Sequence, residues 1–226
     1  FAGFVLGLSC ASKLSMLIAI PFPLIYIWQN KRLRSKFSSF SLSLFFTNIL
    51  LILIPLFSSG YRKIVIGTNE IKKIFAFNLP LNSDYKLYLM PIAFTILVYT
   101  MWRLKRSNFN LMVSITGLSL LISVLMMPPN PGWYAWLIPF LVIYQVNTDT
   151  IGKIFITCFT LAAVAVTFID STGSDILFLD YFKINEPLFL NESIFFTLII
   201  ALGSVLATRI FRESIRTNDY YLLSRK

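Results

Sequence analysis

The sequence predicts an all-α protein, a polytopic bundle of about seven transmembrane helices formed by one domain over residues 1–226. Two observations carry this prediction. Hydrophobic residues make up 57% of the chain and the mean hydropathy is +0.75, whereas soluble domains are about 45–50% apolar. Charged residues are only 13% and fall in clusters between long apolar runs. Apolar runs of about 20 residues cross a bilayer as helices, so we expect an integral, multi-pass membrane protein.

The apolar runs place the predicted spans. Pro21 and Pro23 should bend the second half of the first span, because proline lacks a backbone donor. The segment 61–77 spaces its apolar residues as an amphipathic helix lying in the membrane surface. The predicted spans are 1–28, 37–57, 87–102, 111–127, 133–146, 153–169 and 194–208.

The basic residues between spans predict the orientation. When the connections are assigned alternately to two sides, one side receives thirteen Lys and Arg and the other receives six. The positive-inside rule makes the richer side cytoplasmic. An odd number of spans then places Phe1 outside and Lys226 in the cytoplasm. The net charge of +10 is explained by topology and anionic membrane lipid, and we expect no nucleic-acid partner.

A proline-rich hairpin precedes the fifth span. Residues 128–139 hold three prolines and a glycine, then Trp133, Tyr134, Trp136 and Pro139. Indole and phenol rings suit a membrane–water boundary. Pro139 cannot donate to the carbonyl of Ala135, so we expect a kink one turn into the span. Two interpretations remain open: a plain interfacial hairpin with an aromatic belt, or a hairpin that lines a polar pocket together with Asn130.

Cationic residues supply candidates for binding an anion. Lys13 is the one charge inside the first predicted span, and it either snorkels to the nearer surface or faces a phosphate within the membrane. Arg62 and Lys63 either form an ordinary solvated basic face or contact an anionic ligand.

Several chemistries are excluded or left without support. The chain has no histidine, which excludes a histidine metal site or general base within it. Cys10 and Cys158 lie in apolar runs, so we expect two free thiols. Nothing indicates a metal, and no cofactor is supported, although a divalent cation stays open. Asp170 directly follows the sixth span and is the one carboxylate we name as a catalytic candidate; the alternative is a hydrated loop residue.

Two stretches resemble a known family. Gly7-Leu8-Ser9-Cys10-Ala11-Ser12-Lys13, followed by Leu17 and Pro21, is similar to the "G-L-A-x-x-x-K … L-P" span of GT-C glycosyltransferases, with Ser9 in the place of Ala and Ile20 in the place of Leu. Residues 131–140 resemble the "P-x-W/Y-x-x-W-L-x-P" hairpin of mannosyltransferase-like members.

The resemblance implies a membrane hexosyltransferase that takes a sugar from a polyprenyl-phosphate donor to a glycan or lipid acceptor at the outer face. It implies substrate binding by Lys13, Arg62, Lys63, Asn130, Trp133, Tyr134 and Trp136. The family's acidic catalytic motif has no match here, and the chain begins at Phe1 within an apolar run. We therefore expect the C-terminal portion of a longer protein, with the catalytic acid upstream of Phe1, in a bacterial or archaeal plasma membrane rather than the endoplasmic reticulum.

Two other classes of function remain open. A flippase or transporter for lipid-linked oligosaccharides would need polar residues at mid-depth in several spans, and Lys13 is the one candidate. A non-catalytic membrane scaffold subunit would need nothing beyond the spans.

Overall fold

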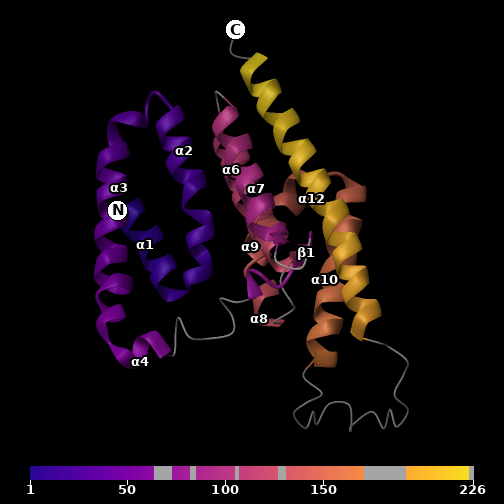
Figure 1. Cartoon of the computed structure of the whole chain (residues 1–226). Helices are drawn as coiled ribbons and strands as arrows, with labels where there is room; N and C mark the ends of the chain where they lie inside the picture. Colours follow the sequence, from indigo (N-terminus) through magenta and orange to yellow (C-terminus); the bar gives the residue numbers. More distant parts are fainter. Residues whose placement is uncertain (64–72, 82–84, 105–106, 127–130, 171–191, 224–226) are drawn as a thin grey trace.

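The computed structural model describes residues 1–63, 73–81, 85–104, 107–126, 131–170 and 192–223 as helices joined by short turns, with one small hairpin (Figure 1). The predicted all-α class is confirmed for this part of the chain, apart from that hairpin. The longer helices are α1 (Ala2–Ser12), α2 (Pro21–Gln29), α3 (Phe37–Asn48), α6 (Leu89–Arg103), α7 (Phe109–Met126), α9 (Ile138–Asn147), α10 (Thr150–Asp170) and α12 (Glu192–Leu223). Two one-turn helices complete the set, α4 (Ser59–Tyr61) and α8 (Pro131–Tyr134).

The first predicted span is broken at Lys13, so a single helix over residues 1–28 is wrong. Lys13 has an extended backbone, with φ −154° and ψ 118°, between α1 and a 3-10 helix over Leu14–Ala19. That 3-10 helix leads into α2 at Pro21, because a proline fits the first turn of a helix but not its interior. In Figure 1 the N-terminus lies part-way up the bundle, α1 descends from it and α2 rises again. The break at Lys13 lies toward the end of the bundle that holds α8, because Lys13 contacts Trp133 and Trp136. The placement of Phe1 outside the membrane stays a prediction.

Two helices among the described residues are long and apolar enough to cross a membrane, Arg34–Phe57 and Phe109–Met126. The first joins α3 to a π-helical turn over Ile49–Leu53 and a 3-10 turn over Pro55–Phe57. The other apolar helices are shorter than 18 residues over their apolar part. Within the described residues, two helices therefore have the length and apolar composition of a membrane span, and the helices at the other predicted spans have shorter apolar parts.

A β-hairpin follows the segment of the predicted surface helix. Strand β1 (Asn78–Pro80) pairs antiparallel with β2 (Lys86–Tyr88), and Leu79 lies opposite Leu87. The expected helix over residues 61–77 is wrong at its end, because residues 74–77 form turns and a bend. Residues 64–72 lie outside the described residues. The third apolar helix begins at Leu89, two residues later than expected, since residues 87–88 belong to the strand.

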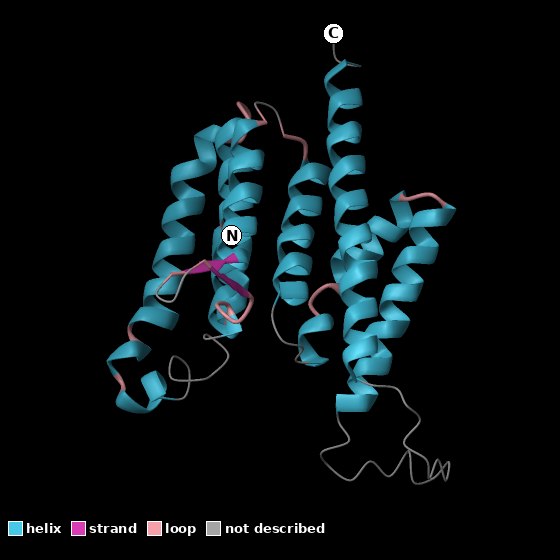
Figure 2. Ribbon diagram, turned by 45° about the vertical axis from the view of Figure 1, so that its right-hand side comes forward, coloured by secondary structure: helices cyan, strands magenta, loops and turns pink. Residues whose placement is uncertain are grey.

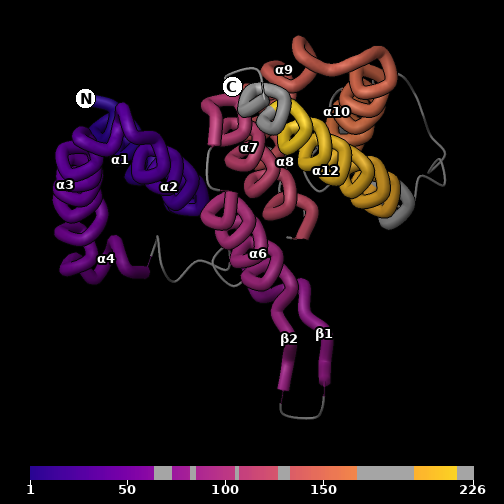
Figure 3. Tube along the Cα trace, turned by 90° about the horizontal axis from the view of Figure 1, so that it is seen from above, coloured from indigo at the N-terminus to yellow at the C-terminus, as the bar shows by residue number. Residues whose placement is uncertain are grey.

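The core lies where α7 packs against α12, α6 and α9, and where α10 packs on α12 (Figure 3). Leu111, Ile115 and Leu121 of α7 are almost fully buried, as are Phe159 of α10 and Leu206 of α12. Gly203 lets α12 approach α7 closely, because a Cβ there would lie 2.5 Å from Cδ2 of Leu125. Cys10 is buried and Cys158 is exposed, and both thiols are free as expected.

Helices α1 and α3 form a second packing unit around two glycines. A Cβ at Gly7 would lie 2.6 Å from Cβ of Thr47, and a Cβ at Gly3 would clash with the carbonyl oxygen of Phe40. Gly3 and Gly7 are spaced four residues apart, which is the small-xxx-small pattern of closely packed membrane helices. This spacing was readable in the sequence and was not among our predictions.

The connections between helices emerge at alternate ends of the bundle (Figures 1 and 2). The α2–α3 turn, the end of α6 and the α9–α10 turn lie toward the upper end in Figure 1. Helices α4 and α8, the end of α10 and the start of α12 lie toward the lower end. The alternation expected from the sequence is therefore present after Lys13.

Candidate functional site

The break at Lys13 places its ammonium group against two indole rings of the proline-rich hairpin. Lys13 Nζ lies 3.8 Å from the centre of the Trp136 ring and 5.7 Å from that of Trp133. A cation held over an indole face is attracted by the negative face of the ring. The structure thus joins two of the predicted features, which are far apart in the chain.

A small cavity lies beside this lysine. Ser15 and Ser123 add hydroxyl groups to the ammonium and the two indoles, and the Ser123 hydroxyl donates to the carbonyl of Ser119 at 2.7 Å. The cavity wall combines one cation, two hydroxyls and aromatic faces, a composition suited to an anion that carries a ring-shaped group. The lining residues are Lys13, Ser15, Ile18, Leu120, Ser123, Val124, Trp133 and Trp136.

Pro139 shapes the turn that presents Trp136. Helix α8 ends at Tyr134 and α9 begins at Ile138, so the expected kink is a full interruption of the helix. Pro139 has no amide hydrogen to donate to the carbonyl of Ala135. The amide of Ile138 donates to that carbonyl instead, at 3.3 Å. The same i to i−3 hydrogen-bond pattern holds for the two residues before Ile138. The amide of Trp136 donates to the carbonyl of Trp133, and the amide of Leu137 donates to that of Tyr134. The proline therefore places Trp136 in a turn rather than within a helix.

The other predicted binding residues do not join this cavity. Tyr134 is buried in the core, where its ring meets Phe159 edge-on with centres 6.3 Å apart. Trp133 and Tyr134 are adjacent in α8, and successive side chains of a helix point in different directions around its axis. Arg62 and Lys63 are exposed at the end of α4 and are not among the residues lining the cavity. Asn130 and the side chain of Asp170 lie outside the described residues.

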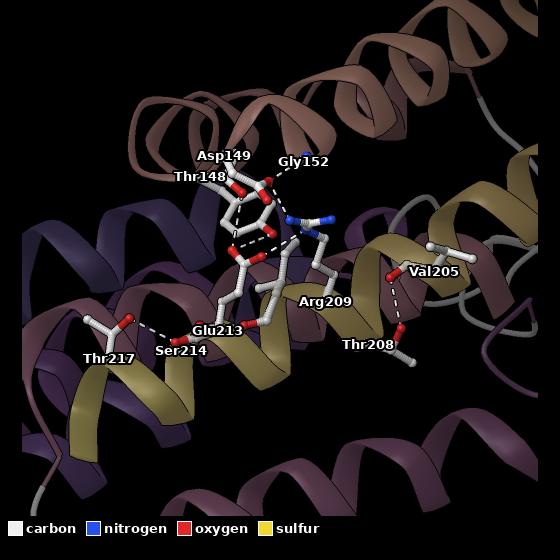
Figure 4. Close-up of polar contacts among 11 residues, drawn as sticks. Thr148, Asp149, Gly152, Val205, Thr208, Arg209, Glu213, Ser214 and Thr217 are labelled. Atoms are coloured by element: carbon white, nitrogen blue, oxygen red, sulfur yellow. Dashed lines mark hydrogen bonds and ion pairs between the residues drawn. The ribbon is translucent and has the colours of Figure 1, made fainter. Parts of the chain in front are cut away.

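A second polar cluster ties α12 to the turn between α9 and α10 (Figure 4). Arg209 forms an ion pair with Asp149 and a second one, at 2.8 Å, with Glu213. Glu213 also accepts hydrogen bonds from the hydroxyls of Tyr144, at 2.8 Å, and Thr148, at 3.1 Å. The sequence analysis missed this cluster. The spacing of Arg209 and Glu213 by four residues, and an Asp just before a helix, were the signals that could have found part of it.

Asp149 caps the start of α10. Its carboxylate accepts the amide of Gly152 at 2.9 Å, and these contacts favour the ionised form. The Gly152 amide first, and then the guanidinium of Arg209, hold the pKa of Asp149 below its usual range. The Asp149 carboxylate is therefore ionised at neutral pH, and we call this cluster of Tyr144, Thr148, Asp149, Arg209 and Glu213 the clamp.

Within the described part of the chain, no group of three His, Cys, Asp or Glu side chains could hold a metal ion. Comparison with family models, with curated proteins and with solved structures gives no match. The function must therefore be inferred from the site itself.

Proposed function

We propose that this protein is a multi-pass membrane protein that binds a lipid-linked sugar phosphate, and that it is part of a glycosyltransferase of the GT-C type. The observation that carries the proposal is the Lys13 ammonium over the Trp136 ring and near the Trp133 ring, at a cavity that Ser15 also lines. A polyprenyl-phosphate sugar has a phosphate, which the ammonium would bind, and a sugar ring, which the indoles would contact.

Membrane residence is supported by the surface of the helices. Large apolar side chains of α3 and the turn after it are more than half exposed, among them Phe45, Phe46 and Leu50. A soluble protein rarely exposes an apolar surface of this kind. The alternate placement of the connections, with most basic residues toward one end, supports several crossings and a cytoplasmic C-terminus.

The site supports recognition of phosphate next to a sugar. The Lys13 ammonium would make charge-assisted hydrogen bonds to phosphate oxygens, and the Ser15 hydroxyl would donate a further one. The indole faces would stack on the apolar face of a sugar ring. In the reaction, the acceptor hydroxyl attacks the anomeric carbon, the lipid phosphate leaves with the bonding electrons, and Lys13 stabilises the charge on that phosphate.

A general base for this reaction is not supplied by the described side chains. Two carboxylates are among them, Asp149 and Glu213, and both are bound to Arg209 in the clamp. The proposal therefore assigns donor binding to these residues, and it assigns the deprotonation of the acceptor to none of them.

The test is binding of a radiolabelled polyprenyl-phosphate mannose to the purified protein in lipid nanodiscs. Lys13→Gln should weaken binding by about tenfold to a hundredfold, since hydrogen bonds to charged groups contribute about 1.5–3 kcal/mol, and Lys13→Arg should retain most of it. The control is Arg62→Gln. Arg62 is a cation toward the same end of the bundle as Lys13 but does not line the cavity, so its replacement should leave binding unchanged.

The outcomes separate the rival functions. Equal binding by wild type and Lys13→Gln would reject the site. Binding without transfer to membrane-extract acceptors, together with movement of the donor between leaflets, would favour a transporter. No binding by any form would favour a scaffold subunit.

A further inference from the structure

At the end of the bundle opposite Lys13, Gln29 joins two basic connections. The Gln29 side-chain amide donates to the carbonyls of Met101 and Trp102, at 3.1 and 3.0 Å, and so caps the end of α6. Its carbonyl accepts the hydroxyl of Ser107 at 3.0 Å. The end of α2 is thereby held beside the end of α6 and beside Ser107 (Figures 1 and 2).

This junction gathers exposed cations that we call the basic rim: Lys31, Arg32, Arg34, Lys36 and Arg103. The two described carboxylates with a visible side chain, Asp149 and Glu213, pair with Arg209 and not with the rim. A cluster of like charges without acid partners attracts anions, and phosphates above all.

Aromatic rings border the same rim. The guanidinium of Arg34 lies 4.3 Å from the centre of the Trp28 ring, and Trp28 meets Phe37 edge-on at 5.1 Å. Trp102 is 56% exposed beside Arg103. Indoles next to basic side chains mark the headgroup level of a bilayer, so the cations lie where lipid phosphates would be.

We propose that the basic rim is a binding site for anionic phospholipid headgroups of the cytoplasmic leaflet, held open by Gln29. It rests on the membrane placement proposed above and not on sugar transfer. Two features favour a phospholipid over other anions: its phosphate complements the positive charge of the rim, and the indoles beside the rim suit the headgroup level of a bilayer. Each Lys or Arg near such a surface contributes about 1 kcal/mol toward anionic lipid.

The experiment measures how many phosphatidylglycerol molecules remain on the protein, by native mass spectrometry after extraction from vesicles of equal phosphatidylglycerol and phosphatidylcholine content. Wild type should retain phosphatidylglycerol selectively. The double variant Arg32→Gln with Arg34→Gln should lower that selectivity by about thirtyfold, since it removes two such cations. The matched control, Arg62→Gln with Lys63→Gln, removes the same charge at the other end and should leave it unchanged.

A third variant separates geometry from charge. Gln29→Leu keeps every cation but releases the two connections from each other, and should lower selectivity at least threefold. Equal selectivity in wild type and the Arg32/Arg34 variant, or the same loss in the Arg62/Lys63 control, would overturn the proposal. So would tighter binding of a short RNA or of inorganic phosphate than of phosphatidylglycerol. Lipid selectivity is read without any sugar donor, so a failure here is distinct from a failure of donor binding.

Discussion

The Lys13 ammonium lies 3.8 Å from the centre of the Trp136 ring, which fixes the break after α1 against the turn before α9. The contact depends on two interruptions of helix, one at Lys13 and one before Pro139. Trp133 lies farther from the ammonium, at 5.7 Å. The Trp136 indole therefore attracts the Lys13 ammonium more strongly than the Trp133 indole does.

Replacing the nearer indole should cost more than replacing the farther one. Trp136→Leu removes the closer ring face, whose attraction for a cation is worth about 0.5–2 kcal/mol, and should weaken donor binding roughly threefold to thirtyfold. Trp133→Leu should have a smaller effect. Binding of the labelled donor to each variant in nanodiscs checks this order. An equal or reversed order would mean that the rings act through sugar stacking and not through the lysine.

The α1–α3 contact should be sensitive to a single methyl group. Gly7→Ala places a Cβ 2.6 Å from Thr47, and such overpacking costs about 1–3 kcal/mol. We expect a lower thermal unfolding midpoint in detergent. Gly60→Ala is the matched control, because its Cβ would lie 3.8 Å from Ser58 and should change little. Thr47→Gly in the Gly7→Ala background should restore part of the loss. A full loss in the double variant would contradict a direct clash.

The clamp at Arg209 should make stability depend on acid pH. The pKa of Asp149 is lowered in the folded state, by the Gly152 amide and then by Arg209. A carboxylate with a lowered folded pKa stabilises the protein above its unfolded pKa, which is about 3.9. That contribution is lost as pH falls through the folded pKa. Unfolding midpoints measured from pH 7 to pH 3 should therefore fall more for wild type than for Asp149→Asn.

The same titration has an internal control. All other residues are the same in wild type and Asp149→Asn, so acid sensitivity that does not come from Asp149 is common to both proteins. The two curves should converge at the acid end. Parallel curves over the whole range would show that Asp149 contributes no pH-dependent stability.

Residue patterns predicted the helical class and the alternation of connections, because these follow from local rules. Long apolar runs form helices, basic residues collect between them, and a helix cannot continue through Pro139. The patterns did not predict the contact of Lys13 with Trp133 and Trp136, since it joins residues far apart in the chain. They did not predict the break at Lys13, since an apolar run reads the same whether it crosses once or turns back. They also missed the clamp, because Arg209 and Asp149 meet only through the packing of α12 against the α9–α10 turn. The patterns grouped Tyr134 with Trp133 and Trp136, whereas its side chain lies in the core.

The membrane orientation gives the last prediction. In a variant with Cys10 and Cys158 replaced by Ala, a cysteine at Ser35 lies on the exposed α2–α3 turn, and a cysteine at Ser58 lies beside α4 at the other end. Because the basic connections should face the cytoplasm, a membrane-impermeant maleimide applied to intact cells should label the Ser58→Cys protein and not the Ser35→Cys protein. Permeabilising the membrane should expose both. Labelling of both positions in intact cells, or of Ser35→Cys alone, would reverse or remove the proposed topology, and with it the assignment of Lys13 to the outer face.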